Sequence, residues 1–315
     1  MLIHLTKSNQ SAQLALLTVL TIVFWLPIFW KNKPIAIIGP QTFLYSTLFG
    51  WTATYVVLAK LLAFFCVVLQ AYMLNEIIRR HALSKNPMFV GLVYVVLMSA
   101  QSEWLTMQPF LLSNFFILAG FSNLFKIHDR KEPYDSVFNA SFWLALAALI
   151  SPSLLPFGMI ICWVFLFYPI NKWREWVIAI IGFIFPFFVL FLWASLANRM
   201  DVFAEYALPV WDFSGFENLF NQSFSKRIFV VVVSGMGLLS AGFMRLRLKE
   251  KEISQRKKII AMMLAAIWII PVAIATSCLF FAFFIAEQLY RNERKWWVEI
   301  VFYGLLVVVF YARFF

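Results

Sequence analysis

Lys60 is a charged residue in a stretch of sequence where a charge is unexpected. It lies within "TYVVLAKLLAFFCVVL", with apolar neighbours for many positions on either side. A lysine inside a membrane span indicates a functional site by default, because burying its charge in hydrocarbon is costly. The alternative is a lysine that snorkels to the outer surface, whose level Tyr55 and Trp51 mark nearby.

Glu103 lies in "SAQSEWLTMQPFLLSN", between two apolar runs and beside Trp104. It is either the polar tip of a hairpin or a carboxylate that acts at the membrane surface, as a base or in binding an acceptor. Glu103 and Lys60 fall on the same side of the membrane at comparable shallow depth. The sequence therefore suggests three partners for Lys60: Glu103, an acid from 198–227, or the phosphate of a lipid-linked ligand.

The longest polar interval, 198–227, holds four acids that are further binding candidates. They are Asp201, Glu205, Asp212 and Glu217. Phenylalanines at 213, 216, 220 and 224 are spaced to form one aromatic face of a helix. An amphipathic helix lying in the outer interface explains this pattern, and a lid over a site at the outer surface is the sharper alternative.

Other kinds of chemistry find little support in the motifs. Nucleotide-binding, dinucleotide-binding, zinc-protease and serine-hydrolase fingerprints are not found. The three cysteines, Cys66, Cys162 and Cys278, lie singly in apolar runs and are expected to be buried, inert thiols. The three histidines also lie apart, so we expect no metal site and no cofactor.

The composition indicates that most of the protein lies in a lipid bilayer. Of 315 residues, 63% are hydrophobic and only 13% are charged, against about 25% charged in a soluble domain. The bilayer must therefore cover most of the chain. The net charge of +11 follows from basic residues kept in cytoplasmic loops, so nucleic acid is not an expected partner.

These residues must be positioned by membrane helices, each of which needs about 20 apolar residues. The sequence predicts an all-α, polytopic transmembrane bundle of about ten helices, with short interfacial helices in the outer loops and a single integral membrane domain over 1–315. The candidate spans are 12–30, 52–74, 87–102, 105–125, 137–151, 154–170, 176–197, 228–244, 259–286 and 296–312. The short ones suggest helices packed inside the bundle or helices that enter and turn back.

The distribution of lysine and arginine predicts a cytoplasmic N-terminus. The loop "RLRLKEKEISQRKK" (Arg245–Lys258) alone carries seven basic residues. It is expected to be a positive-inside loop, with binding of anionic lipid headgroups as the alternative. The stretch 259–286 contains Pro271 and is either one kinked helix or two short ones, which also determines the side of the C-terminus.

Two resemblances extend this picture. The spacing of segments, "LSNFFILAGFSNLF" and the ending "KWWVEIVFYGLLVVVF" resemble an uncharacterised Bacteroidota family of polytopic inner-membrane proteins. That resemblance implies an integral membrane protein and no mechanism. The short helices and outer acids look like multi-spanning glycosyltransferases that use polyprenyl-phosphate sugars. Those enzymes typically carry an acid in the first outer loop, whereas 31–51 has none here.

Three functions remain open from the sequence, all placed in the bacterial inner membrane with the lipid bilayer as a partner. The first is a non-catalytic subunit or assembly factor of the cell envelope, bound to other inner-membrane subunits. The second is a glycosyltransferase-like or polymerase-like protein that binds a polyprenyl-phosphate lipid through Lys60 and Glu103. The third is a transporter, for which the spans offer few polar residues.

Overall fold

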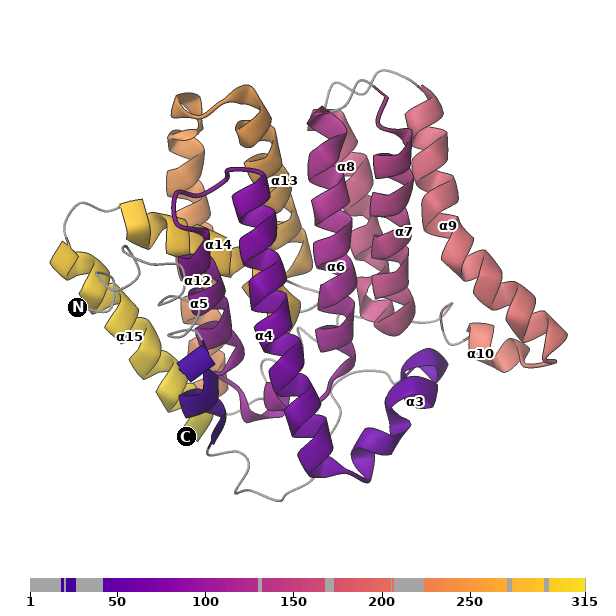
Figure 1. Ribbon diagram of the computed structural model, residues 1–315, viewed down its shortest axis with the longest axis horizontal. Helices are drawn as coiled ribbons and strands as arrows, with labels where there is room; N and C mark the ends of the chain where they lie inside the picture. Colours follow the sequence, from indigo (N-terminus) through magenta and orange to yellow (C-terminus); the bar gives the residue numbers. More distant parts are fainter. Residues whose placement is uncertain are drawn as a thin grey trace.

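The fold is helical throughout the described ranges of the chain. The structure, a computed structural model, describes residues 18–19, 21–26, 42–129, 132–167, 173–204, 206, 224–270, 274–291 and 295–314. Its α-helices (Figure 1) are α3 (Phe43–Phe49), α4 (Val56–Arg80), α5 (Pro87–Met98), α6 (Pro109–Lys126), α7 (Tyr134–Ile150), α8 (Ile160–Phe167), α9 (Trp173–Leu196), α10 (Met200–Ala204), α12 (Phe224–Leu246), α13 (Ile253–Ile269), α14 (Ile274–Arg291) and α15 (Lys295–Phe314). Short 3-10 helices cover Gly50–Ala53, Ser102–Leu105, Ile127–Asp129, Pro152–Met159 and Leu248–Glu250. The predicted all-α class is confirmed for these ranges.

Three of the described helices are long and apolar enough to cross a membrane. They are α4, α9 and α12, with 25, 24 and 23 residues. At 1.5 Å per residue, each exceeds the roughly 30 Å of hydrocarbon in a bilayer. Shorter apolar helices include α5 and α7. The helices thus support a membrane protein, while a bundle of ten spans stays a prediction.

The apolar stretch 259–286 forms two helices rather than one kinked helix. Helix α13 ends at Ile269 and α14 begins at Ile274, on either side of Pro271. A proline in a helix interior removes one backbone hydrogen bond and clashes with the preceding turn. Helices α13 and α14 pack against each other. Of the two alternatives predicted for 259–286, the structure therefore shows two short helices.

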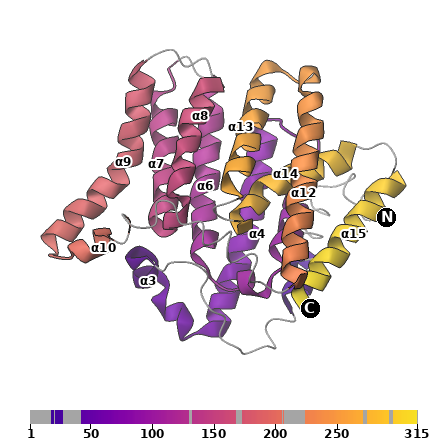
Figure 2. The same cartoon turned by 180° about the vertical axis from the view of Figure 1, so that it is seen from behind.

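The helices form two groups that α4 connects (Figures 1 and 2). In one group α7 packs between α6 and α9, and in the other α14 packs against α5 and α12. Helix α4 contacts both α5 and α6. The lower part of α9 leans away from the bundle in Figure 1. Helix α9 contains Pro186, and a proline is a common cause of such a change in direction.

Helix α5 has only 12 residues and is enclosed by protein. Every residue from Phe89 to Met98 is buried. Asn75 on α4 accepts a hydrogen bond of 2.8 Å from the backbone N–H of Gly91. A Cβ at Gly91 would lie 2.4 Å from the Asn75 amide nitrogen, so only glycine allows this approach. The expectation that short segments pack inside the bundle is confirmed for this one.

The two ends of the bundle differ in charge. The C-terminal ends of α4, α6 and α12 lie together, at the top of Figure 1. We call this the basic end, because it carries Arg79, Arg80, Lys126 and the turn Arg245–Lys258. The N-terminal ends of α4 and α12 lie at the opposite end, with the turn Ser102–Leu105. We call this the Glu103 end.

Candidate functional site

Glu103 forms an ion pair with Lys226, which lies in the first turn of α12. The two residues are separated by 123 positions in the sequence. Their side chains keep 33% and 21% of their surface exposed, so the pair lies at the boundary between protein and surroundings. Sequence reasoning named Lys60 as a candidate partner of Glu103. In the structure, the Glu103 carboxylate pairs with Lys226 instead.

The turn that carries Glu103 is fixed on both sides. Trp104 is buried and makes edge-on ring contacts with Phe110 and Phe229, at centroid distances of 6.1 and 6.0 Å. The side-chain amide of Gln108 donates to the backbone carbonyl of Glu103 over 3.2 Å. These contacts join the turn between α5 and α6 to α12. The Glu103–Lys226 pair is therefore the charged part of a larger link between helices.

Lys60 is completely buried in α4. The residues exposed along the same part of α4 are apolar, among them Val57, Leu58 and Leu61. Lys60 therefore faces the interior of the protein. Snorkelling would place its ammonium at the surface, and a side chain with no exposed area does not reach it.

The outer-loop acids are only partly within the described residues. Asp201 lies 3.6 Å from Arg199, and both side chains are more than half exposed. The Arg199 guanidinium also stacks over Phe43, 5.1 Å from the ring centre. An exposed pair of this kind contributes little to stability. Glu205, Asp212 and Glu217 lie outside the described residues, as do the predicted interfacial helix residues at 213, 216 and 220.

A second charged cluster, which the sequence did not single out, lies at the basic end. The ammonium of Lys258 on α13 donates to both carboxylate oxygens of Asp129, over 2.8 and 3.1 Å. It also donates to Nδ1 of His81, over 3.3 Å. Ser254 donates to the same carboxylate over 3.2 Å. The Lys258 side chain is only 5% exposed. This cluster joins α13 to the ends of α4 and α6.

The electrostatics of this cluster favour a neutral histidine. Burial and the nearby Lys258 ammonium lower the pKa of His81 to about 4. The lone pair on Nδ1 is then available to accept a hydrogen bond from the Lys258 ammonium. Burial acts to raise the pKa of Asp129, but the hydrogen bond and charge of Lys258 outweigh it and hold this pKa below its usual range. At neutral pH the cluster thus consists of one ammonium, one carboxylate and one neutral imidazole.

Lys251 provides a second attachment at the basic end. Helix α4 ends at Arg80 and is followed by a residue with left-handed backbone, Ala82 (φ 49°), and the N–H of Leu83 donates back to the carbonyl of Ile78. This helix-ending motif turns the Leu83 carbonyl toward Lys251, which donates to it over 2.8 Å. Lys251 also pairs with the buried Glu287 on α14 at 3.3 Å.

Neutral polar side chains meet in the core between α4, α5 and α6. The Tyr94 hydroxyl donates to the side chain of Gln70 over 2.6 Å and accepts from Asn114 over 3.5 Å. All three residues are buried. The side-chain oxygen of Asn114 has no hydrogen-bond partner within the described part of the chain. Because buried polar groups are costly to leave unpaired, the two hydrogen bonds of the Tyr94 hydroxyl favour one arrangement of α4, α5 and α6.

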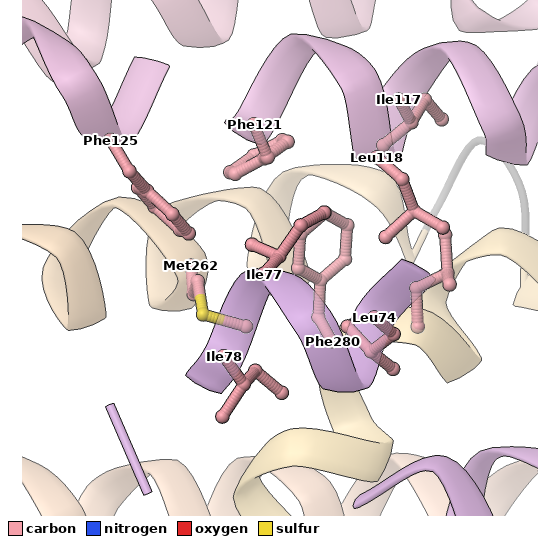
Figure 3. Close-up of a pocket in the computed structure, with 10 residues that line it drawn as sticks. Leu74, Ile77, Ile78, Ile117, Leu118, Phe121, Phe125, Met262 and Phe280 are labelled. Carbon is pink, nitrogen blue, oxygen red and sulfur yellow. The ribbon is translucent and has the colours of Figure 1, made fainter. Parts of the chain in front are cut away.

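A small cavity is lined by side chains of α4, α6, α13 and α14 (Figure 3). Its walls are hydrocarbon apart from the thioether of Met262. Phe125 both lines the cavity and contacts the His81 ring edge-on at 5.3 Å. Met262 follows Lys258 by one helical turn. The lining offers no group that could bind a polar substrate, so the cavity suits apolar atoms only. The other lining residues are Leu74, Ile77, Ile78, Ile117, Leu118, Phe121, Leu279 and Phe280.

Metal ligands and thiols do not gather in the described ranges. No three His, Cys, Asp or Glu side chains there are close enough to hold a metal ion. Cys278 is buried, as expected, whereas Cys66 is half-buried and Cys162 is exposed. The expectation of three buried thiols was wrong at Cys162, because its apolar helix turns that side outward.

Comparison of the chain with models of protein families, with curated proteins and with solved structures finds no match. The site is therefore interpreted from its geometry alone. Sequence reasoning identified Glu103 but missed its partner, and it missed the cluster at the basic end. The available signal was that His81 and Asp129 each follow the end of an apolar run, which places both at one membrane surface.

Proposed function

We propose that the chain is a multi-pass protein of the bacterial inner membrane that acts as a non-catalytic subunit or assembly factor of the cell envelope. One observation carries this proposal: three carboxylates among the described residues pair with lysines and so hold helices together. Glu103 pairs with Lys226, Asp129 with Lys258 and Glu287 with Lys251. Each pair joins segments that are distant in sequence. Carboxylates engaged in this way define a rigid scaffold.

The outer surface of the described helices supports the same proposal. Large apolar side chains are exposed along α4, α9, α12 and α15, among them Phe65, Phe188, Leu239 and Val307. These surfaces fit lipid tails and the apolar helices of other membrane subunits. The concentration of basic residues at one end of the bundle supports a cytoplasmic position for that end, since lysine and arginine are retained on the cytoplasmic side.

Co-purification tests the proposal. The tagged full chain, extracted from membranes in mild detergent, is expected to migrate as a complex with at least one other membrane protein. A chain that is always alone and monomeric would contradict a subunit role. A matched pair of variants, Gly237→Leu and Gly235→Leu, controls for folding: a Cβ at Gly237 would lie 2.2 Å from the Phe281 ring, whereas a Cβ at Gly235 has no atom within 4 Å. Only Gly237→Leu should disrupt the complex through loss of the fold.

A second candidate function is transfer or polymerisation of lipid-linked glycans at the outer face. Lys60 favours it, because a fully buried lysine within a helix that could cross the membrane is a strong indication of a binding role. Because Lys60 has no exposed area, the segments that cover it would have to part before its side chain could contact the phosphate of a polyprenyl-phosphate lipid. A Lys60→Met variant that folds and retains full cellular function would exclude this role.

A further inference from the structure

The turn between α12 and α13 is held rigidly by three of its seven basic side chains. Lys251 donates to the Leu83 carbonyl just after α4, and Lys258 donates to the Asp129 carboxylate. The Arg256 guanidinium donates to the backbone carbonyls of Lys251 and Lys249, over 2.6 and 2.5 Å. These three cations are therefore occupied inside the protein and fix the path of the loop.

Of the four remaining basic residues, three face outward and the fourth, Lys257, is half-buried. Arg245, Arg247 and Lys249 are all exposed. Two apolar side chains lie among them: Leu246 is 77% exposed and Ile253 is 66% exposed. The turn thus presents three cations, two aliphatic side chains and one carboxylate, that of Glu252, on a backbone that is already fixed. Such a combination matches the boundary between headgroups and acyl chains.

We infer that this turn is a binding surface for the headgroups of anionic phospholipids in the cytoplasmic leaflet. The exposed guanidinium groups and the ammonium contact lipid phosphates, and Leu246 and Ile253 enter the adjacent acyl region. Because the backbone is fixed by internal contacts, binding orders little additional chain. The inference rests on the membrane placement and orientation in the proposed function, and it adds a specific class of lipid as ligand.

A lipid fits this surface better than a soluble acidic protein or a nucleic acid. The turn directly continues α12, whose 23 residues are apolar enough to cross a membrane. The surface therefore starts at the level where lipid phosphates lie. Two exposed aliphatic side chains among the cations would be unfavourable in water and are favourable in the interface. A nucleic acid would use the cations alone.

Lipid selectivity of the reconstituted protein tests the inference. The full chain is placed in bilayers of equal parts phosphatidylcholine and phosphatidylglycerol, extracted in mild detergent, and its retained lipids are measured by mass spectrometry. Phosphatidylglycerol should be enriched over the starting mixture. The double variant Arg245→Gln/Arg247→Gln should weaken this enrichment by about five-fold for each charge removed. Arg245→Lys/Arg247→Lys keeps the charges and should retain it.

The control removes the same net charge at the opposite end. Arg199 and Arg227 are exposed there, and Arg199→Gln/Arg227→Gln should leave the enrichment unchanged. Equal losses in both double variants, or no enrichment in the wild type, would overturn the inference. Loss of a bound protein from the Arg245→Gln/Arg247→Gln variant with unchanged lipids would also overturn it. A chain that does not float with the vesicles at all would instead refute the proposed membrane placement.

Discussion

Removing the carboxylate of Asp129 should leave a buried cation without its counter-charge. The Lys258 ammonium is 5% exposed and bonds both Asp129 oxygens. Removing one partner of a fully buried pair costs about 3–5 kcal/mol. Asp129 itself is 47% exposed, so water screens part of this effect. We expect Asp129→Asn to lower the free energy of unfolding by about 2 kcal/mol.

The double-mutant cycle separates this charge effect from lost packing. Lys258→Met removes the buried cation and leaves Asp129 half in water, so it should cost less than about 1 kcal/mol. The double variant Asp129→Asn/Lys258→Met should then be about as stable as Lys258→Met alone. The measurement is reversible unfolding by titration with denaturing detergent in mixed micelles, followed by helical circular dichroism. Single-variant losses that simply add in the double variant would refute the ion-pair argument.

Three further predictions concern other parts of the molecule. The pKa of His81 falls from 6.5 to about 4 on folding. The contribution of neutral His81 to stability is therefore complete above pH 6.5 and is lost as the pH falls toward 4. This loss of stability, on the order of 3 kcal/mol, should vanish in His81→Gln when the free energy of unfolding is measured against pH. Gly237→Ala should cost about 1–3 kcal/mol in the same unfolding assay, because its Cβ would lie 2.2 Å from the Phe281 ring; Gly235→Ala should be neutral or stabilising, and equal losses would contradict this packing. Tyr94→Phe removes the hydroxyl that joins two buried amides and should cost about 1 kcal/mol; unchanged unfolding would show that this bond contributes nothing.

Much of the helical arrangement could be predicted because the bilayer imposes simple rules. Apolar runs became helices close to their expected limits, as in α4, and Pro271 correctly marked a possible break between two helices. The short α5 was expected inside the bundle for the same reason: a run too short to cross must be covered by protein. These conclusions depend only on length, hydropathy and backbone hydrogen bonding.

The partners of the charged residues could not be predicted in this way. The expected depth of Glu103 in the membrane did not determine which lysine or arginine at that depth would pair with it. Its partner, Lys226, is 123 positions away in the sequence. Lys258 looked like one of seven equivalent loop cations, although it is buried against Asp129. Which of several like charges turns inward depends on the rotation and tilt of each helix, which hydropathy does not fix.

The central claim is that Glu103 holds helices together and does no chemistry. It is tested most directly by the neutral double variant Glu103→Gln/Lys226→Met in a strain that lacks the wild-type gene. The double variant replaces an ion pair by uncharged side chains of similar size, and we expect it to restore growth and envelope integrity as the wild type does. A double variant that inserts and unfolds like the wild type but fails to restore function would contradict the claim and assign chemistry to Glu103.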